Sequence, residues 1–262
     1  MTDGADPLVR RARDAAGVVT LTLNRPQAYN ALSEELLAAL QAEVDALGSD
    51  TGVRVVVLAG AGKAFCAGHD LRQMRAEPSL EYYRRLFAQC SQLMQSLTRL
   101  PVPVIARVHG VATAAGCQLV AQCDLAVASS EARFAVSGVN LGLFCSTPGV
   151  PLARNVGRKQ AFEMLVTGEF IDARQAQERG LVNRVVEPAA LDAEVARLAA
   201  SICAKPRVAV ALGKQLFYRQ VELGLAAAYE AAGQTMACNM MEADALEGVQ
   251  AFIDKRAPRW GI

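Results

Sequence analysis

Short apolar runs rich in Val, Ile and Leu recur along the first half of the chain, separated by segments whose apolar residues follow helical spacing. The runs occupy residues 18–23, 53–58, 102–108 and 125–128. Strands that are apolar at almost every position are usually covered on both faces. The alternation of such strands with helical segments therefore predicts an α/β fold in which helices enclose a mostly buried sheet.

Two long helices are expected between these strands. The hydroxyl of Ser33 can cap the first helix, and the apolar residues that follow share one stripe: Leu36, Leu37, Leu40, Val44 and Leu47. The second helix is expected at residues 79–97. Pro101 and Pro103 then end helical structure and favour the start of the next strand.

The pattern changes after about residue 200, where strand-like runs stop and Ala-rich helical patterns begin. These patterns occupy residues 208–221, 225–241 and 243–255. The methionines among them are expected to be helix core rather than an adaptable binding stripe. They are Met236, Met240 and Met241.

No Gly/Ser-rich linker separates the strand-containing part of the chain from the helical part that follows it. Residues 1–200 are expected to form the core, and residues 201–262 a helical region. Because contiguous parts without a flexible linker rarely hang free, we expect this region to pack on the core or on a neighbouring subunit.

Composition excludes several classes of protein. The chain has 262 residues, 52% of them hydrophobic, and a formal net charge of +1. This apolar content excludes wholesale disorder, and the lack of a basic excess argues against a nucleic-acid partner. Residues 134–153 are uncharged, but their prolines, glycines and polar side chains exclude a membrane span. The polar first twenty residues resemble neither a signal nor a transit peptide, so a cytoplasmic location is expected.

Cysteine and histidine usage gives little support for a metal site. The seven cysteines form no CxxC pair, and the chain has two histidines, His69 and His109. The cysteines are expected to be reduced thiols packed as small hydrophobic groups. We therefore expect no bound metal.

Three segments crowded with small residues follow apolar strands, at residues 60–71, 110–118 and 137–150. The first contains GK but lacks the earlier glycine and the following Ser or Thr of a phosphate-binding loop. The second lacks the GxGxxG spacing of a dinucleotide site. Its position between a strand and a helix does offer free amides at a positive helix end, which suit a developing oxyanion.

Five motifs, which follow one another in order after residue 16, carry a family resemblance. They are LNRPQAYNAL (23–32), AFCAGHDL (64–71), PVPVIARVHGVATAAGCQL (101–119), CDLAVAS (123–129) and EGVQAFIDKRAPRW (247–260). In these motifs the chain resembles the enoyl-CoA hydratase/isomerase, or crotonase, family. The segment SGVNLGLFCSTPGV (137–150) is similar to a narrower branch, enoyl-CoA hydratase domain-containing protein 3.

The resemblance implies a crotonase-type ββα spiral core with a C-terminal helical trimerisation region, assembled as a homotrimer or homohexamer. It also implies an acyl-CoA ligand, with coenzyme A as part of the substrate and no separate cofactor. The thioester oxygen would accept hydrogen bonds from the backbone N–H groups of His69 and Ala115. Ala114 and Ala115 stand where the family usually has glycines.

The same resemblance implies a pocket for the adenine of coenzyme A. Phe252 and Lys255 would come to it from an adjacent subunit. The residues of the first subunit would be Gln27, Ala28, Ala67, Asp70 and Leu71.

The two catalytic glutamates of the family's hydratases fall on Gln118 and Gly138. An amide does not titrate near neutral pH, and glycine has no side chain, so neither residue can move a proton. The nominal activity is that of a lyase that hydrates 2-enoyl-CoA to 3-hydroxyacyl-CoA. Because each general acid or base contributes roughly 10²- to 10⁴-fold, we expect this turnover to be very low.

Two alternatives stay open at the level of sequence. One is a noncatalytic acyl-CoA binder. The other is an enolate-forming enzyme such as an acyl-CoA decarboxylase, because the AGHD motif around His69 is similar to that of methylmalonyl-CoA decarboxylases. Their tyrosine partner falls on Cys145, for which a buried structural thiol is expected.

Overall fold

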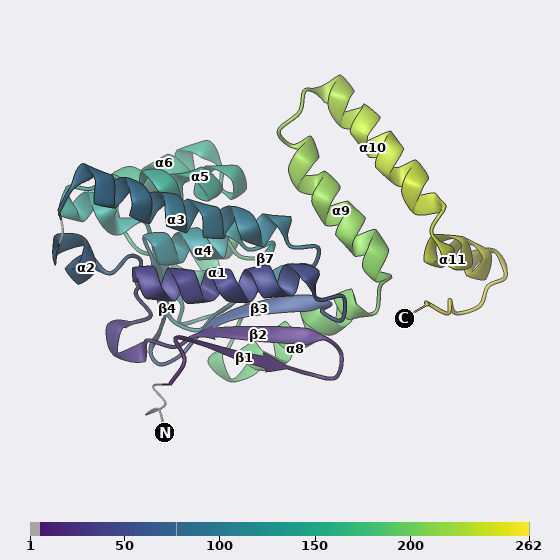
Figure 1. The fold of residues 1–262 in the computed structure, drawn as a ribbon, viewed down its shortest axis with the longest axis horizontal. Helices are drawn as coiled ribbons and strands as arrows, with labels where there is room; N and C mark the ends of the chain where they lie inside the picture. The colour runs from purple at the N-terminus through teal and green to yellow at the C-terminus, as the bar shows by residue number, and fades with distance from the viewer. Residues whose placement is uncertain (1–5, 77, 262) are drawn as a thin grey trace.

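The computed structural model describes residues 6–76 and 78–261 as an α/β protein with two sheets (Figure 1). The larger sheet has six strands in the order β1-β2-β3-β5-β7-β10. Strand β1 runs antiparallel to β2, and the other neighbours are parallel. The strand bounds are Val9–Arg13 (β1), Val18–Leu23 (β2), Val55–Gly60 (β3), Val104–Val108 (β5), Leu125–Ser129 (β7) and Arg184–Val186 (β10).

The smaller sheet has four short strands in the order β4-β6-β8-β9. They are Ala64–Cys66 (β4), Val111–Thr113 (β6), Arg133–Ala135 (β8) and Ile171–Asp172 (β9). Strands β3, β5 and β7 of the larger sheet are each followed by one strand of the smaller sheet and then by helical structure. This repeated ββα order confirms the expected spiral core.

Helices cover both faces of the larger sheet. Alternate strand residues separate the two faces, since Val56 and Leu58 belong to the main core while Val55 and Val57 pack with α8. Helices α1 and α3 pack together over the main core (Figure 1). The helices are Glu34–Ser49 (α1), Leu71–Ala76 (α2), Leu80–Arg99 (α3), Ala115–Gln122 (α4), Ser146–Asn155 (α5), Arg158–Thr167 (α6), Ala173–Glu178 (α7), Leu191–Cys203 (α8), Arg207–Gln220 (α9), Leu225–Met240 (α10) and Ala243–Ile253 (α11).

The structure confirms both predicted helix starts and the capping role predicted for Ser33. Ser33 precedes α1, and its hydroxyl accepts a hydrogen bond from the N–H of Leu36 at 3.3 Å. Ser79 does the same for Tyr82 at the start of α3, at 3.1 Å. All five residues of the predicted α1 stripe are buried.

Residues 134–153 form the end of β8, a short 3₁₀ helix at Ser137–Leu141 (η2), a short connection and most of α5, which contains Pro148 and Pro151. Within the part of the chain that the structure describes, no helix combines the length and the apolar character that crossing a membrane would need.

The cysteines partly follow expectation. All seven are free thiols, and five of them are buried. Cys238 is exposed on α10, so the expectation of packed thiols is wrong for this residue. Cys203 lies between these extremes, at the end of α8.

The C-terminal helices are joined to the core through α9. The ammonium of Lys214 donates to the carbonyls of Leu97 (2.8 Å) and Val102 (2.9 Å) and pairs with the carboxylate of Asp124 (2.7 Å). The hydroxyl of Tyr218 donates to the other oxygen of Asp124 at 2.7 Å. These contacts attach α9 to the core, whereas the division of the chain at residue 200 stays a prediction.

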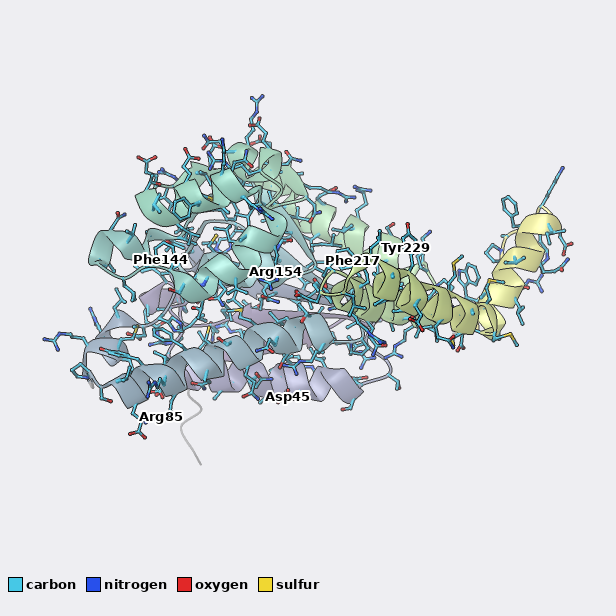
Figure 2. All side chains as sticks on the ribbon, turned by 90° about the horizontal axis from the view of Figure 1, so that it is seen from above. Asp45, Arg85, Phe144, Arg154, Phe217 and Tyr229 are labelled. Carbon is cyan, nitrogen blue, oxygen red and sulfur yellow. The ribbon has the colours of Figure 1, made fainter. Side chains whose placement is uncertain are left out.

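Helices α10 and α11 extend beyond the core as an arm, seen from two directions in Figures 1 and 2. The arm exposes large apolar side chains, among them Leu225, Tyr229, Met236, Met241, Phe252 and Ile253. Met236 and Met241 are 72% and 78% exposed, and Met240 is 40% exposed. The expectation that these methionines form helix core is therefore wrong for the single chain, because the last helices have no core of their own to enclose.

Candidate functional site

Two of the small-residue bends predicted from sequence meet in space. Gly68, between β4 and α2, has a left-handed φ of +94°, and a Cβ built on it would lie 3.3 Å from the backbone nitrogen of Ala115 at the start of α4. Gly116 holds α4 against β4, because a Cβ there would overlap the carbonyl of Cys66. The glycines let the backbones approach this closely.

The backbone N–H groups of His69 and Ala115 are free at this meeting point. Neighbouring amides are engaged: Asp70 N–H donates to Leu32 at 3.1 Å, and Ala114 N–H donates to Ala135 at 2.9 Å. Among the hydrogen bonds of the described residues, neither the N–H of His69 nor that of Ala115 has an acceptor. Unpaired amides of this kind are rare inside proteins, so the two groups are available to a ligand.

Ala114 adopts φ 50° and ψ −120° immediately before α4. This region of backbone space favours glycine, and a residue with a side chain is strained there. The Cβ of Ala114 points toward Gly68, since a Cβ built on that glycine would lie only 2.9 Å from it. The alanine therefore narrows the space between the two bends.

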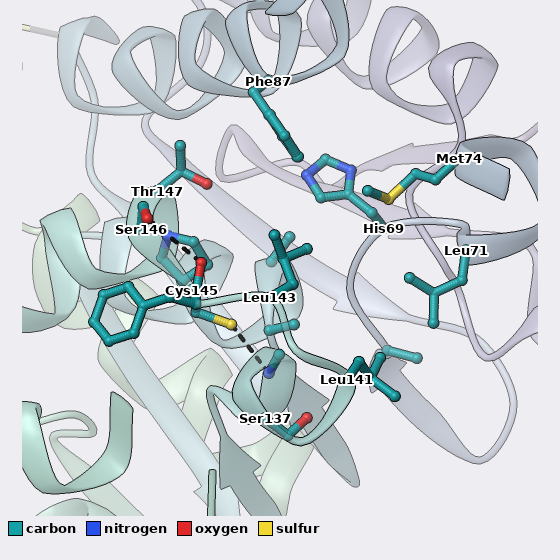
Figure 3. Close-up of a pocket in the computed structure, with 16 residues that line it drawn as sticks. His69, Leu71, Met74, Phe87, Ser137, Leu141, Leu143, Cys145, Ser146 and Thr147 are labelled. Atoms are coloured by element: carbon teal, nitrogen blue, oxygen red, sulfur yellow. Dashed lines mark hydrogen bonds between the residues drawn. The ribbon is translucent and has the colours of Figure 1, made fainter. Parts of the chain in front are cut away.

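An apolar cavity of about 340 Å³ opens beside the two amides (Figure 3). Loops and helices from α2, α3, α4, η2 and α5 form its walls. The lining residues are Ala67, His69, Leu71, Met74, Phe87, Ala114, Ala115, Ser137, Gly138, Leu141, Leu143, Phe144, Cys145, Ser146, Thr147 and Pro148. This lining, drawn from the described residues, includes no carboxylate and no basic side chain other than His69.

The side chain of His69 occupies one wall of the cavity. Its ring contacts the ring of Phe87 edge-on, with 5.5 Å between centroids and 68° between planes. Burial lowers the pKa of His69 to about 4, although the nearby carbonyl of Leu32 opposes that shift. The imidazole is therefore neutral at pH 7.

Of the two positions that correspond to the family's catalytic glutamates, Gly138 lines the cavity and Gln118 does not. Gln118 is 3% exposed on α4, its side-chain oxygen has no hydrogen-bond partner, and it does not line the cavity. Gly138 does line the cavity and donates its N–H to the sulfur of Cys145 at 3.2 Å. A Cβ at Gly138 would overlap the carbonyl of Leu143 and lie 2.7 Å from Sγ of Cys145. Glycine is therefore required by packing at this point.

Cys145 is a buried thiol, as expected. Burial raises its pKa, and the N–H of Gly138 opposes the shift only in part. A thiol with a raised pKa is protonated near neutral pH and is a weak nucleophile. This environment supports a structural role.

Only some of the residues expected around coenzyme A line the cavity. Ala67 and Leu71 line the cavity, and Gln27 and Ala28 lie in a 3₁₀ helix at Pro26–Ala28. Asp70 already has a structural role. It accepts a hydrogen bond from Arg25 at 3.0 Å and two more from the N–H groups of Arg72 and Gln73 in the first turn of α2.

Burial alone would raise the pKa of Asp70, but the hydrogen bonds from Arg25 and from the N–H of Gln73 hold it below the usual value. Asp70 is thus an ionised carboxylate that fixes the start of α2 at the edge of the cavity.

Phe252 and Lys255 do not reach the cavity of their own chain. Phe252 lies in the last turn of α11 and Lys255 just after it, at the opposite end of the molecule from α2 (Figure 1), and Phe252 is 85% exposed. Their contribution to a neighbouring subunit's adenine pocket stays a prediction, as do the roles assigned to the other site residues.

Sequence reasoning missed residues that shape the site. Phe87 and Met74 form the wall around His69, and Asn30 holds the β4 edge by donating to the carbonyls of Ala61, Ala64 and Phe65. The signal for Asn30 was its place in the first family motif. Phe87 follows Tyr83 at helical spacing on α3, a spacing that core residues share.

The comparisons with known proteins agree with this architecture. The family model for enoyl-CoA hydratase/isomerase matches residues 13–261. Enoyl-CoA hydratase domain-containing protein 3 of Xenopus laevis is 47% identical over 244 residues, which cover 93% of this chain and 83% of the relative. The crystal structure of an enoyl-CoA hydratase from Mycobacterium smegmatis has a TM-score of 0.97 and 67% identity, covering 97% of this chain and 99% of that one. The crystal structure of human enoyl-CoA hydratase domain-containing protein 3 has a TM-score of 0.93 and 43% identity, covering 97% and 100%.

The relatives contradict the expected cytoplasmic location. The Xenopus laevis and human forms of enoyl-CoA hydratase domain-containing protein 3 are named mitochondrial. The expectation rested on the polar character of the first twenty residues, and the composition of that one segment does not determine the compartment. The cytoplasmic assignment is therefore wrong.

The matches confirm the family resemblance, its narrower branch and the α/β spiral fold. They extend over nearly the whole chain, including the helices after residue 200. The chain therefore belongs to the enoyl-CoA hydratase/isomerase, or crotonase, family.

Proposed function

We propose that the protein binds an acyl-CoA thioester with its carbonyl oxygen between the N–H groups of His69 and Ala115. The observation that carries this proposal is the pair of unpaired amides at neighbouring bends beside an apolar cavity. A thioester supplies an acceptor for the amides and an apolar chain for the cavity. Each donor to a developing oxyanion contributes about 3 kcal/mol to a transition state.

Hydration of 2-enoyl-CoA to 3-hydroxyacyl-CoA is the nominal reaction, with a turnover far below that of a two-glutamate hydratase. Water must lose a proton to a base, and the α-carbon must gain one. The cavity lining offers no carboxylate for either step. His69, with a pKa of about 4, is a weak base at neutral pH.

The decarboxylase alternative has less support than acyl-CoA binding with weak hydration. A decarboxylase substrate carries an acyl carboxylate, which needs a cation or several hydrogen-bond donors when buried. No Lys or Arg is among the side chains that line the cavity.

The assembly that we propose is a homotrimer or a homohexamer. The exposed apolar side chains of α10 and α11 need a partner surface, and a neighbouring copy would cover them. In that arrangement Phe252 and Lys255 of one copy would meet the adenine end of a ligand held near Gln27 and Asp70 of another.

Paired ligands test the proposed binding mode. Butyryl-CoA has the thioester carbonyl, and S-butyl-CoA lacks it but is otherwise similar. Because two amide hydrogen bonds are worth about 1 kcal/mol each, butyryl-CoA should bind roughly thirtyfold more tightly in calorimetric titrations. Equal affinities would contradict the role of the two amides, and no binding of either would overturn the acyl-CoA proposal.

Crotonyl-CoA tests the chemistry separately. Loss of conjugated-thioester absorbance should be slow, because each missing acid or base removes roughly 10²- to 10⁴-fold in rate. Turnover equal to that of a hydratase with both glutamates, assayed in parallel, would show that the lost carboxylates are replaced by other groups. Tight butyryl-CoA binding with no turnover at all would favour a noncatalytic binder.

A further inference from the structure

The cavity beside the two free amides is walled mainly by large apolar side chains from three parts of the fold (Figure 3). They are Leu71 and Met74 of α2, Phe87 of α3, and Leu141, Leu143 and Phe144 around the end of η2. Among the described residues that line the cavity, none is Asp, Glu, Lys or Arg. Such walls favour hydrocarbon, because contact with them removes apolar surface from water.

Three of these apolar side chains are about half exposed in the single chain. Leu71 is 53% exposed, Leu143 46% and Phe144 45%. An acyl chain in the cavity would cover part of this surface. Each methylene group that it buries there should raise the affinity about fourfold.

The cavity has room for a six-carbon acyl group together with its thioester. At roughly 30 Å³ per methylene-sized group, the share of one water molecule in the liquid, 340 Å³ holds about eleven such groups. In the proposed binding mode the thioester oxygen lies at the backbone amides of His69 and Ala115, which themselves line the cavity. The end of a six-carbon chain is therefore expected within the apolar walls.

The polar groups in and beside the wall offer no ionic partner to a charged chain end. The hydroxyl of Ser137 shares a hydrogen bond with Thr113 at 2.9 Å, and that of Ser146 contacts a backbone carbonyl at 3.4 Å. Arg25 is already paired at 3.0 Å with Asp70, which lies at the edge of the cavity. The charge of Arg25 is thus used within the protein.

The N-terminus of α5 also lies in the wall, at Ser146 and Thr147, and a helix N-terminus favours an anion. This effect raises the affinity for a nearby anion by up to about thirtyfold. Enclosing a carboxylate without a cation lowers the affinity by roughly a thousandfold. The cost of burial therefore outweighs the attraction of the helix end.

We infer that the cavity takes acyl-CoA thioesters whose acyl group is a plain hydrocarbon chain, and that it rejects acyl groups of the same length that end in a carboxylate. This inference rests on the proposed acyl-CoA function and names the class of acyl group that the site takes. The apolar side chains around Leu143 cause the selection, because they enclose the end of the chain and supply no charge.

Hexanoyl-CoA and adipyl-CoA test the inference by calorimetric titration near pH 7. Both have six acyl carbons, and only adipyl-CoA ends in a carboxylate. The native protein should bind hexanoyl-CoA at least about thirtyfold more tightly than adipyl-CoA. It should also bind hexanoyl-CoA roughly fifteenfold more tightly than butyryl-CoA, the effect of two more buried methylene groups.

A cation placed in the wall should weaken this selection. Leu143→Lys adds an ammonium group among the lining side chains and should narrow the preference for hexanoyl-CoA over adipyl-CoA by about tenfold. Val150→Lys on α5 is the matched control, because Val150 is 52% exposed, close to the 46% of Leu143, but does not line the cavity. It adds the same charge and should leave the preference unchanged.

Equal affinities of the native protein for hexanoyl-CoA and adipyl-CoA would overturn the inference. A Leu143→Lys variant that keeps the native preference, or a Val150→Lys variant that narrows it as much, would also overturn it. Equal affinities for hexanoyl-CoA and butyryl-CoA would show that the chain does not enter the cavity, which contradicts the inference as well. If none of the three thioesters binds, the proposed acyl-CoA function fails instead.

Discussion

Ala114 is the residue whose backbone departs most clearly from what its side chain favours. At φ 50° and ψ −120° it occupies a region that glycine adopts more easily. Such strain costs roughly 1–3 kcal/mol of stability. Glycine would relieve it, but glycine also makes the unfolded chain more flexible, which lowers stability by about 0.5–1 kcal/mol. Ala114→Gly should therefore stabilise the fold by about 1 kcal/mol and raise Tm by roughly 2–4 °C in calorimetry.

Ala115→Gly is the matched control for this prediction. Ala115 is the first residue of α4, next to Ala114 in the chain, and its backbone is helical. Glycine there should destabilise the protein by up to about 1 kcal/mol. A rise in Tm for both variants, or for neither, would show that the conformation of Ala114 is not strained.

His69 should make the stability of the fold depend on pH. Its pKa is about 4 in the folded protein, against 6.5 for an unperturbed histidine, so between these values the unfolded chain binds more protons. The free energy of unfolding should fall as pH drops below 6.5, by up to about 1.4 kcal/mol per pH unit, and level off near the folded pKa. Urea titrations from pH 7 to 4.5 measure this slope.

Because carboxylates titrate in the same range, the His69 contribution is the difference between the native protein and His69→Phe. The variant should lack that part of the slope. Parallel stability curves for the two proteins would contradict the low pKa of His69.

At the residue scale the sequence identified the two bends but not their surroundings. His69 and Ala115 could be named because motif and strand-to-helix position point to backbone amides. The unpaired ring nitrogens of His69 and the packing around Gly138 could not, because Phe87 and Cys145 meet these residues only in the folded chain.

At the scale of elements, η2 packs tightly at Gly138 against the segment that leads into α5. Gly138→Ala should destabilise the protein by roughly 1–3 kcal/mol, because the added methyl would meet the Leu143 carbonyl and the Cys145 sulfur. Gly213→Ala on α9 is the control, since a Cβ there meets nothing within 4 Å and alanine favours the helix by about 1 kcal/mol. Chemical denaturation measures both variants.

If Gly138→Ala leaves the free energy of unfolding unchanged, η2 is not packed as tightly as the structure indicates. If it destabilises as expected, a glutamate at this position cannot restore hydration without rebuilding the segment. Gln118→Glu combined with Gly138→Glu should then lose stability before it gains activity.

Elements with a long, regular pattern could be predicted, and short ones could not. Helix α1 follows from a capping serine and an apolar stripe, α3 was predicted from its range, and β2, β3, β5 and β7 follow from apolar runs. Strands β4, β6, β8 and β9 have only two or three residues each, too few for a period to appear. Strand β1 is mostly exposed and rich in arginine, which hides it from a search for apolar runs.

At the scale of the whole molecule, the sequence predicts that the C-terminal region is helical, but it does not predict that apolar side chains of these helices are exposed. The three Ala-rich patterns match α9, α10 and α11 closely. The pattern records which residues are apolar, not whether the chain itself covers them. Met241 and Phe252 are exposed in the single chain, and the apolar pattern does not distinguish such residues from buried ones.

A polar cluster joins α9, which leads to the arm, to the core. Asp124 follows the core helix α4 and accepts hydrogen bonds from Lys214 and Tyr218 on α9, and from the N–H of Val104. Burial lowers the pKa of Lys214, while Asp124 opposes the shift. Removing the ammonium would leave the carboxylate of Asp124 partly buried without its cation.

Lys214→Met should therefore destabilise the protein by about 3 kcal/mol and increase hydrogen exchange of the α9 amides before that of β3 or β5. Arg154→Met is the control: Arg154 pairs with Glu222, just past α9, but both side chains are largely exposed, so the loss should stay below about 1 kcal/mol. Figure 2 shows Arg154 on the face where α5 and α9 come together. If the two variants cost the same, or if α9 in Lys214→Met exchanges no faster than the core strands, the arm is held by apolar packing and not by the Lys214–Asp124 pair.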